Sequence, residues 1–181
     1  AAGLKLILAL SSGNLILPAA ASKFTVAGNF TYTTGTIDYE TTNSDSTIVF
    51  TSDQTIAGTF TVKHMEFGGS QGSSRADHTI SDTVTVAGNL SFTSTNLTSF
   101  LTGTLNVKGN VSDANAMSSL SNGAIVFSGT GDQTVTGASG AEVTAFGFIT
   151  INKASGTLFL VGNIGVGGID YDAGTIDAGT S

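Results

Sequence analysis

Asparagines, aspartates and histidines are the residues of this sequence whose types and spacing could do chemistry. Four Asn-x-Ser/Thr sequons begin at Asn29, Asn89, Asn96 and Asn110. Such an asparagine accepts an N-linked glycan when its turn is exposed. Three of the four follow a glycine directly, and Gly-Asn pairs favour turns. We therefore expect these four asparagines to be candidate glycosylation sites.

Three aspartates near the C-terminus form a weak candidate calcium site. Asp170 and Asp172 are two residues apart, so they would point to one face of a strand. With Asp177 they would offer the carboxylate oxygens that Ca²⁺ prefers. The alternative is that these aspartates form solvated turns, and we expect no cofactor apart from this calcium candidate.

The remaining polar residues do not indicate an active site. His64 and His78 occur in a chain without cysteine, which leaves too few ligands for a zinc site. We expect both histidines to lie on the surface. Serine is so abundant that its presence carries no information about a hydrolytic triad, and we find no clustered acidic cleft of the kind that glycoside hydrolysis needs. We expect the chain not to be an enzyme.

Composition indicates an all-β chain. Charged residues make up only 10% of the sequence, while 28 Thr, 21 Ser and 24 Gly dominate it. Thr, Val, Ile and Phe favour strands, and Gly and Asn favour the turns between them. The net charge of −7 argues against nucleic acid and against an anionic membrane surface. Low charge with much Ser and Thr is typical of secreted proteins, so we expect an extracellular or cell-surface location without membrane insertion.

Internal repetition is the most informative pattern in the sequence. Thr25–Asn29 recurs as Thr85–Asn89, and Asp53–Gly58 recurs in related form as Asp132–Gly137. Several such echoes are separated by about 75–80 residues. We therefore predict N-terminal apolar strands over 1–23 and a repetitive β domain over 24–181. That domain would hold about two degenerate units, approximately 24–103 and 104–181.

The strands are expected to be short and to have one apolar face. Apolar residues alternate with Thr, Ser or Asn, as in Phe24-Thr25-Val26 and Phe60-Thr61-Val62. Turn residues recur about every 8–12 positions. This rhythm predicts a β-solenoid-like stack of short strands. A Greek-key or jelly-roll β-sandwich completed by a donated strand is the alternative fold.

Several segments resemble a known class of repeats. Ile125–Gly137, Phe146–Lys153, Gly156–Asn163 and Gly174–Gly179 are similar to the Gly/Thr-rich repeats of large prokaryotic surface proteins and adhesin-like exoproteins. The resemblance implies an extracellular, adhesive or fibrous role and a β-solenoid-like stack, and it carries no catalytic residues. The first copy departs from the pattern, with Lys63-His64-Met65-Glu66 where the second has Ile-Thr-Ile-Asn.

The apolar segment from Leu4 to Leu17 is our candidate for insertion into a neighbouring subunit. We expect two short strands around a Ser-Ser-Gly-Asn turn, with an uncleaved signal peptide as the alternative. Strand donation gains main-chain hydrogen bonds and apolar burial. The assembly candidates are Leu4, Leu6, Ile7, Leu8, Leu10, Leu15, Ile16 and Leu17.

These patterns predict a structural protein. We expect a subunit or segment of an extracellular filament, sheath or adhesin stalk that forms a homopolymer through its β-strand edges. A carbohydrate-binding adhesin or phage-fibre module is the alternative, with surface glycans as partners. That alternative ranks lower because the chain has no Trp and only three Tyr for sugar stacking. A polysaccharide-degrading β-helix enzyme ranks lowest.

Overall fold

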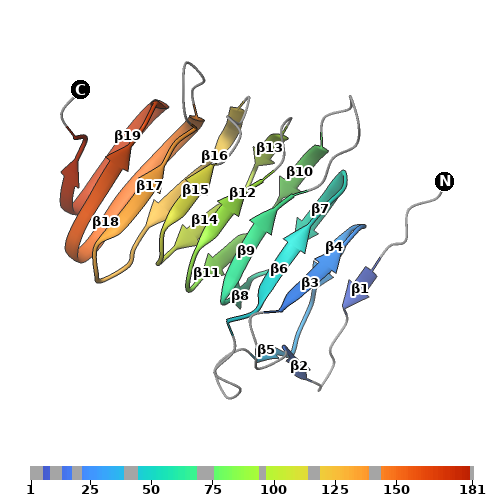
Figure 1. Cartoon of the computed structure of the whole chain (residues 1–181). Coiled ribbons are helices and arrows are strands. Elements are labelled where there is room, and N and C mark those ends of the chain that lie inside the picture. The colour runs from blue at the N-terminus through green and yellow to red at the C-terminus, as the bar shows by residue number, and fades with distance from the viewer. Residues whose placement is uncertain are drawn as a thin grey trace.

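The structure is a computed structural model that describes residues 6–8, 14–17, 22–38, 45–68, 76–93, 97–113, 119–138 and 144–179. The described residues contain strands and no helix, and every strand pairing is parallel. Successive coils stack into an elongated β-solenoid (Figure 1). The predicted all-β solenoid is therefore confirmed over the sandwich alternative. None of the described residues belongs to a helix that could span a membrane.

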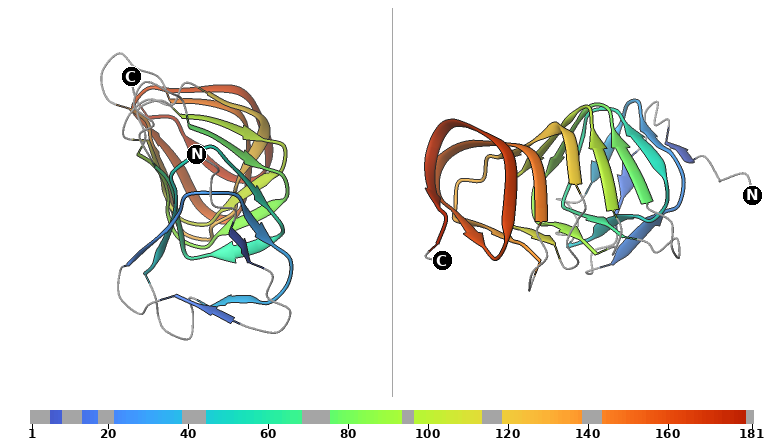
Figure 2. Two further views of the ribbon diagram at one scale, coloured as in Figure 1. Left: turned by 90° about the vertical axis from the view of Figure 1, so that its right-hand side faces the viewer. Right: turned by 90° about the horizontal axis from the view of Figure 1, so that it is seen from above.

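The strands form three columns, which we call faces A, B and C (Figure 2). Face A contains β1 (Leu6–Leu8), β4 (Phe30–Tyr32), β7 (Gln54–Ala57), β10 (Ala76–Ile80) and β13 (Leu97–Leu101). Face B contains β2 (Asn14–Ile16), β5 (Thr36–Asp38), β8 (Phe60–Val62), β11 (Thr83–Val86) and β14 (Thr104–Val107). Face C contains β3 (Lys23–Val26), β6 (Thr47–Phe50), β9 (His64–Phe67), β12 (Leu90–Phe92), β15 (Val111–Asp113) and β17 (Gln133–Thr136). The longer β16 (Ser119–Phe127) covers faces A and B, whereas β18 (Thr144–Val161) and β19 (Ile164–Asp177) each run across all three faces.

The structural repeat is the single coil, which is much shorter than the sequence echoes. Register partners in neighbouring coils lie between 17 residues apart, for Ile48 and Met65, and 26 apart, for Phe30 and Ile56. The echoes span several coils and return on a different face. Val26 lies in β3 on face C, whereas its counterpart Val86 lies in β11 on face B. The division of the chain into units at 103 and 104 stays a prediction.

A single apolar core fills the tube that the coils enclose. Alternate residues of each strand point inward, as in β11, where Val84 and Val86 are buried and Thr83 and Thr85 are more exposed. Phenylalanines continue the stack from coil to coil: the rings of Phe50, Phe67 and Phe92 are 6.0 Å and 5.4 Å apart. Register pairing between coils therefore stacks apolar side chains one above another. Their packing contacts stabilise the core of this cysteine-free chain.

Glycines mark the corner between faces A and B. They lie two positions before the inward-facing apolar residue of face B, at Gly58, Gly103, Gly123, Gly147 and Gly167. A Cβ atom on Gly103 would lie 2.0 Å from the carbonyl oxygen of Asp82 in the preceding coil. Backbone therefore approaches backbone at this corner more closely than any side chain permits.

Asp82 occupies the glycine position in the β10–β12 coil. The Gly58 N–H donates a 2.8 Å hydrogen bond to its carboxylate, and the Ser81 hydroxyl donates another at 2.9 Å. The backbone bond, followed by the hydroxyl, lowers the pKa of Asp82. The carboxylate thus ties this corner to the preceding coil at the position where the other coils place a glycine.

Face B is interrupted between β5 and β8. β2 and β5 form a separate two-stranded sheet, while the other described strands belong to one sheet of 17 strands. The cause is a longer corner: Gly58 packs against the Tyr32 carbonyl, and three more residues follow Tyr32 before β5 begins. The Tyr32 hydroxyl donates to the Gly35 carbonyl and closes this extra turn. As a result, β5 stands away from the column that β8, β11 and β14 form.

Candidate functional sites: an open end coil and a polar groove

The outermost described coil, β19, exposes positions that are core positions on β8, β11, β14, β16 and β18. Ile169 and Tyr171 are in register with Ile149 and Ile151 of β18. Ile149 and Ile151 are 1% and 0% exposed, whereas Ile169 and Tyr171 are 48% and 59% exposed. Among the described strands, β19 pairs only with β18. This end of the solenoid therefore presents an apolar surface bordered by an open strand edge.

The same turn shapes β19 and the displaced strand β5. Tyr171 donates its hydroxyl hydrogen to the Gly174 carbonyl, as Tyr32 does to Gly35, and both glycines have positive φ angles of 112° and 114°. Each turn is followed by Thr-Ile-Asp. The sequence echo between these segments thus corresponds to a real structural repeat, a tyrosine-closed corner.

The N-terminal assembly candidates lie within the first coil of their own chain. Strand β1 pairs with β4, β2 pairs with β5, and the Leu17 N–H donates to the Asp38 carbonyl at 3.1 Å. Leu17 is buried, and Ile16 is 61% exposed. The described candidates, Leu6, Ile7, Leu8, Leu15, Ile16 and Leu17, belong to this coil; Leu4 and Leu10 lie outside the described residues. Their donation to a neighbour stays a prediction.

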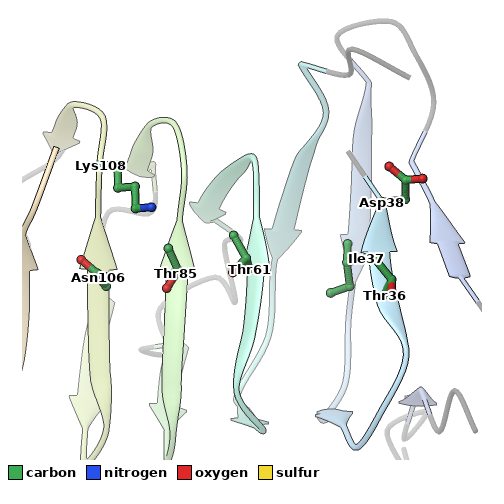
Figure 3. Close-up of a pocket in the computed structure, with 7 residues that line it drawn as sticks. All are labelled: Thr36, Ile37, Asp38, Thr61, Thr85, Asn106 and Lys108. Carbon is green, nitrogen blue, oxygen red and sulfur yellow. The ribbon is translucent and has the colours of Figure 1, made fainter. Parts of the chain in front are cut away.

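A groove runs along face B where β5 stands apart (Figure 3). Its volume is about 430 Å³. The lining residues are Thr36, Ile37 and Asp38 from β5, Thr61, Thr85 and Asn106 from β8, β11 and β14, and Lys108. Polar side chains therefore dominate its surface.

Three of the four sequon asparagines have a structural role at the corners. The Asn89 side-chain oxygen accepts the Asn110 N–H at 3.0 Å, and the Asn110 oxygen accepts the Thr134 N–H at 2.8 Å. Asn29 accepts the Thr55 N–H in the same way, at 2.9 Å. Each asparagine thus links its coil to the next. All three are exposed, whereas Asn96 lies outside the described residues.

Strand alternation explains why these asparagines form sequons. The residue after each corner asparagine points into the core, as Leu90 does, and the next one points outward, as Ser91 does. An outward Ser or Thr at that position completes Asn-x-Ser/Thr. The pattern is therefore expected from the solenoid itself, and glycan attachment at these sites stays a prediction.

The segment Asp132-Gln133-Thr134, the second copy of the Asp-Gln-Thr repeat, contributes to a buried polar network between coils. The Gln133 amide donates to the carbonyls of Val107 and Gly109, and its oxygen accepts the Gly129 N–H at 2.9 Å. The Lys153 ammonium, 1% exposed, donates to Gln133 Oε1 and to the carbonyls of Gly129 and Gly131, each at 2.8 Å. Burial lowers the pKa of Lys153, and the nearby Asp132 carboxylate opposes this effect. The network joins three successive coils.

In the first copy, Asp53-Gln54-Thr55, the buried glutamine forms no such network within the described residues. Gln54 and His78 are buried register partners on face A. The side-chain nitrogens and oxygen of both lack hydrogen bonds within the described part of the chain. The His78 ring packs 5.0 Å from that of Phe67. Burial lowers the pKa of His78 to about 4, against an opposing effect of Asp53. The expectation that His78 lies on the surface is wrong, because its strand turns it into the core.

His64 belongs to the corner ladder instead of a metal site. Its Nδ1 atom accepts the Asn89 N–H at 2.8 Å, and Nε2 lies 3.4 Å from an Asp45 oxygen. Asp170, Asp172 and Asp177 are exposed on β19, and Asp177 accepts the Gly179 N–H. Within the described ranges, no three His, Asp or Glu side chains gather as metal ligands. The structure therefore does not bring the three calcium candidates together.

One sequence pattern resembles a catalytic elbow. Gly68–Gly72 has the spacing Gly-x-Ser-x-Gly, which in hydrolases requires a strand-to-helix turn. Residues 69–72 lie outside the described residues, and the parts that are described contain no helix. The pattern therefore supports no catalytic assignment.

Comparisons with protein-family models, with curated proteins and with solved structures give no match to this chain.

Proposed function

We propose that this chain is a structural segment of an extracellular filament, sheath or adhesin stalk that assembles end to end through its β-strand edges. The observation that supports the proposal most strongly is the exposure of core positions on β19. Ile169 and Tyr171 have the exposure of surface residues although their register partners are fully buried. A further parallel coil would bury them and pair the open edge.

The complementary surface is the coil of β1, β2 and β3. Its strands follow in the same order, so a second copy would continue the face A and face C ladders of β19 in parallel through β1 and β3, while β2, which lies off the face B column, would cover the face B positions. Such a contact is heterologous, because the two surfaces differ, and it repeats without closing. The result is a homopolymer whose strands lie across the filament axis.

The energy available is sufficient for a specific contact. Full burial of one large apolar side chain contributes roughly 1.5–3 kcal/mol. The apolar side chains that β19 leaves half-buried or exposed are Ile164, Val166, Ile169, Tyr171 and Ile176. Main-chain hydrogen bonds along an edge strand of 14 residues would add to their burial.

The test compares two lysine substitutions, one on β19 and one on its neighbour β18. Ile169→Lys places a charge on the exposed end, whereas Thr150→Lys places it on an outward position of β18 on the same face. We expect light scattering to show that the average mass of the wild-type and Thr150→Lys particles rises with protein concentration. The Ile169→Lys variant should stay monomeric, with an unchanged circular-dichroism spectrum of β structure. A wild type that is monomeric at every concentration contradicts the proposal, as does an Ile169→Lys variant that assembles equally well.

A further inference from the structure

The groove on face B has a regular polar floor. Thr61, Thr85 and Asn106 are register partners on three consecutive strands, so their side chains repeat at the strand spacing of about 4.8 Å. Figure 3 shows the three side chains in a row across the strands. Their alternating neighbours, such as Val84 and Val86, point into the core. The floor therefore presents hydroxyl and amide groups along the solenoid axis.

Strand β5 supplies the wall of the groove. Figure 3 shows β5 standing farther from β8 than β8 stands from β11. The tyrosine-closed corner at Tyr32 and Gly35 sets this position, since it inserts the extra residues that carry β5 off the face. The groove thus results from a defined turn.

The lining combines polar groups with a small apolar surface. Threonine hydroxyls and the asparagine amide each donate and accept hydrogen bonds. The Ser128 hydroxyl donates to Asn106 Oδ1, which holds that amide in one orientation. Ile37 contributes apolar surface from the wall, while Asp38 and Lys108 lie at the rim.

This chemistry selects among ligand classes. A lipid needs a mainly apolar lining, whereas Ile37 is the single aliphatic side chain that lines this groove. A polyanion needs several cations, whereas the groove contains a single lysine and the chain carries a net charge of −7. A neutral sugar chain offers closely spaced hydroxyls for the floor and C–H surfaces for Ile37 and the threonine methyl groups. The volume of the groove, about 430 Å³, is also within the usual range for ligand sites.

We propose that the groove formed by Thr61, Thr85, Asn106 and the β5 wall binds a neutral oligosaccharide lying along the solenoid axis. The site is on the side of the solenoid and shares no residue with the open end at β19. Sugar binding therefore stands or falls independently of end-to-end assembly.

The test uses one substitution at two positions of the same face. Thr85→Val removes a floor hydroxyl and keeps the side-chain shape. Thr150→Val makes the same change on an outward position of face B beyond the groove. The full chain and both variants are applied to an array of neutral oligosaccharides, and the affinity for the best-bound sugar is then measured by calorimetry.

We expect Thr85→Val to weaken sugar binding roughly two- to tenfold, the net value of one hydrogen bond, and Thr150→Val to leave it unchanged. A Thr61→Val/Thr85→Val double variant should weaken it further, with unaltered thermal unfolding. The proposal is overturned if no neutral oligosaccharide binds, if both single variants bind like the wild type, or if the groove captures extended peptides instead of sugars.

Discussion

Buried polar residues in this solenoid are of two kinds. Gln133 and Lys153 satisfy each other and the backbone of neighbouring coils, so their burial adds a polar link between coils. Gln54 and His78 are equally buried but have no hydrogen bonds to protein groups in the described residues. Because an unsatisfied buried polar group costs free energy, the second pair is the weaker point of the core.

His78 makes folding stability depend on pH. Its pKa is about 4 in the folded chain and 6.5 as the ordinary value, so the unfolded chain binds the proton more readily. The free energy of unfolding is highest above pH 6.5, where His78 is neutral in both states. It decreases as the pH falls toward 4, because the unfolded chain then takes up the proton. The shift corresponds to about 3 kcal/mol. Urea unfolding at pH 7 and pH 4 should show this loss in the wild type.

A His78→Leu variant provides the comparison for this prediction. Leucine removes the titrating ring and fills the core with an apolar side chain of similar size. His64, the other histidine, is present in both proteins, so its titration contributes equally to both. We expect the variant to lose about 3 kcal/mol less than the wild type between pH 7 and pH 4. Equal losses in the two proteins would show that His78 is not buried in its neutral form.

Glycines occupy corners at which neighbouring coils approach each other closely. Five corners have Gly directly before Thr and then an inward-facing apolar residue: Gly35, Gly58 and Gly103 lie between faces A and B, and Gly156 and Gly174 lie between faces B and C. All except Gly103 have a positive φ. At Gly58 and Gly156 glycine meets two requirements, a positive φ and close approach of the neighbouring backbone, whereas at Gly103 it meets the second alone.

Replacement of Gly103 by alanine should damage this stacking. The new Cβ would lie 2.0 Å from the Asp82 carbonyl oxygen, so one coil must shift against the other. We expect a loss of about 1–3 kcal/mol or more in the free energy of unfolding. Gly131→Ala is the matched control, because a Cβ there meets nothing within 4 Å. Similar chemical denaturation midpoints for the two variants would refute the close-packed corner.

Strand type and face were predictable from the sequence, because alternation such as Phe60-Thr61-Val62 determines which side chains enter the core. The coil length was not recognised, since the strongest echoes join different faces. The glycines at 103, 123, 147 and 167 have the coil period and were the signal for it. The groove was beyond sequence reasoning, since it depends on how far one corner displaces β5. The burial of His78 was missed because a polar residue on an inward position breaks the alternation rule.

At the scale of the whole molecule, the two ends and the sides of the solenoid have different properties. Within the described residues, β19 presents apolar core positions and a strand edge that pairs with no further strand. The sides present mostly Thr, Ser, Asn and Asp, with few cations and a net charge of −7. Like charge on the sides opposes lateral association and favours growth along the axis. A thin filament with the groove repeated along one side is the expected assembly.

Fibre diffraction from aligned assemblies of the full chain is the sharpest test of end-to-end assembly. End-to-end continuation of the coils predicts a reflection at about 4.8 Å along the filament axis, because the strands lie across it. The Ile169→Lys variant should give no aligned filaments. End-to-end assembly is refuted if the wild type forms no filaments, or if it forms filaments whose reflection at about 4.8 Å lies perpendicular to the axis.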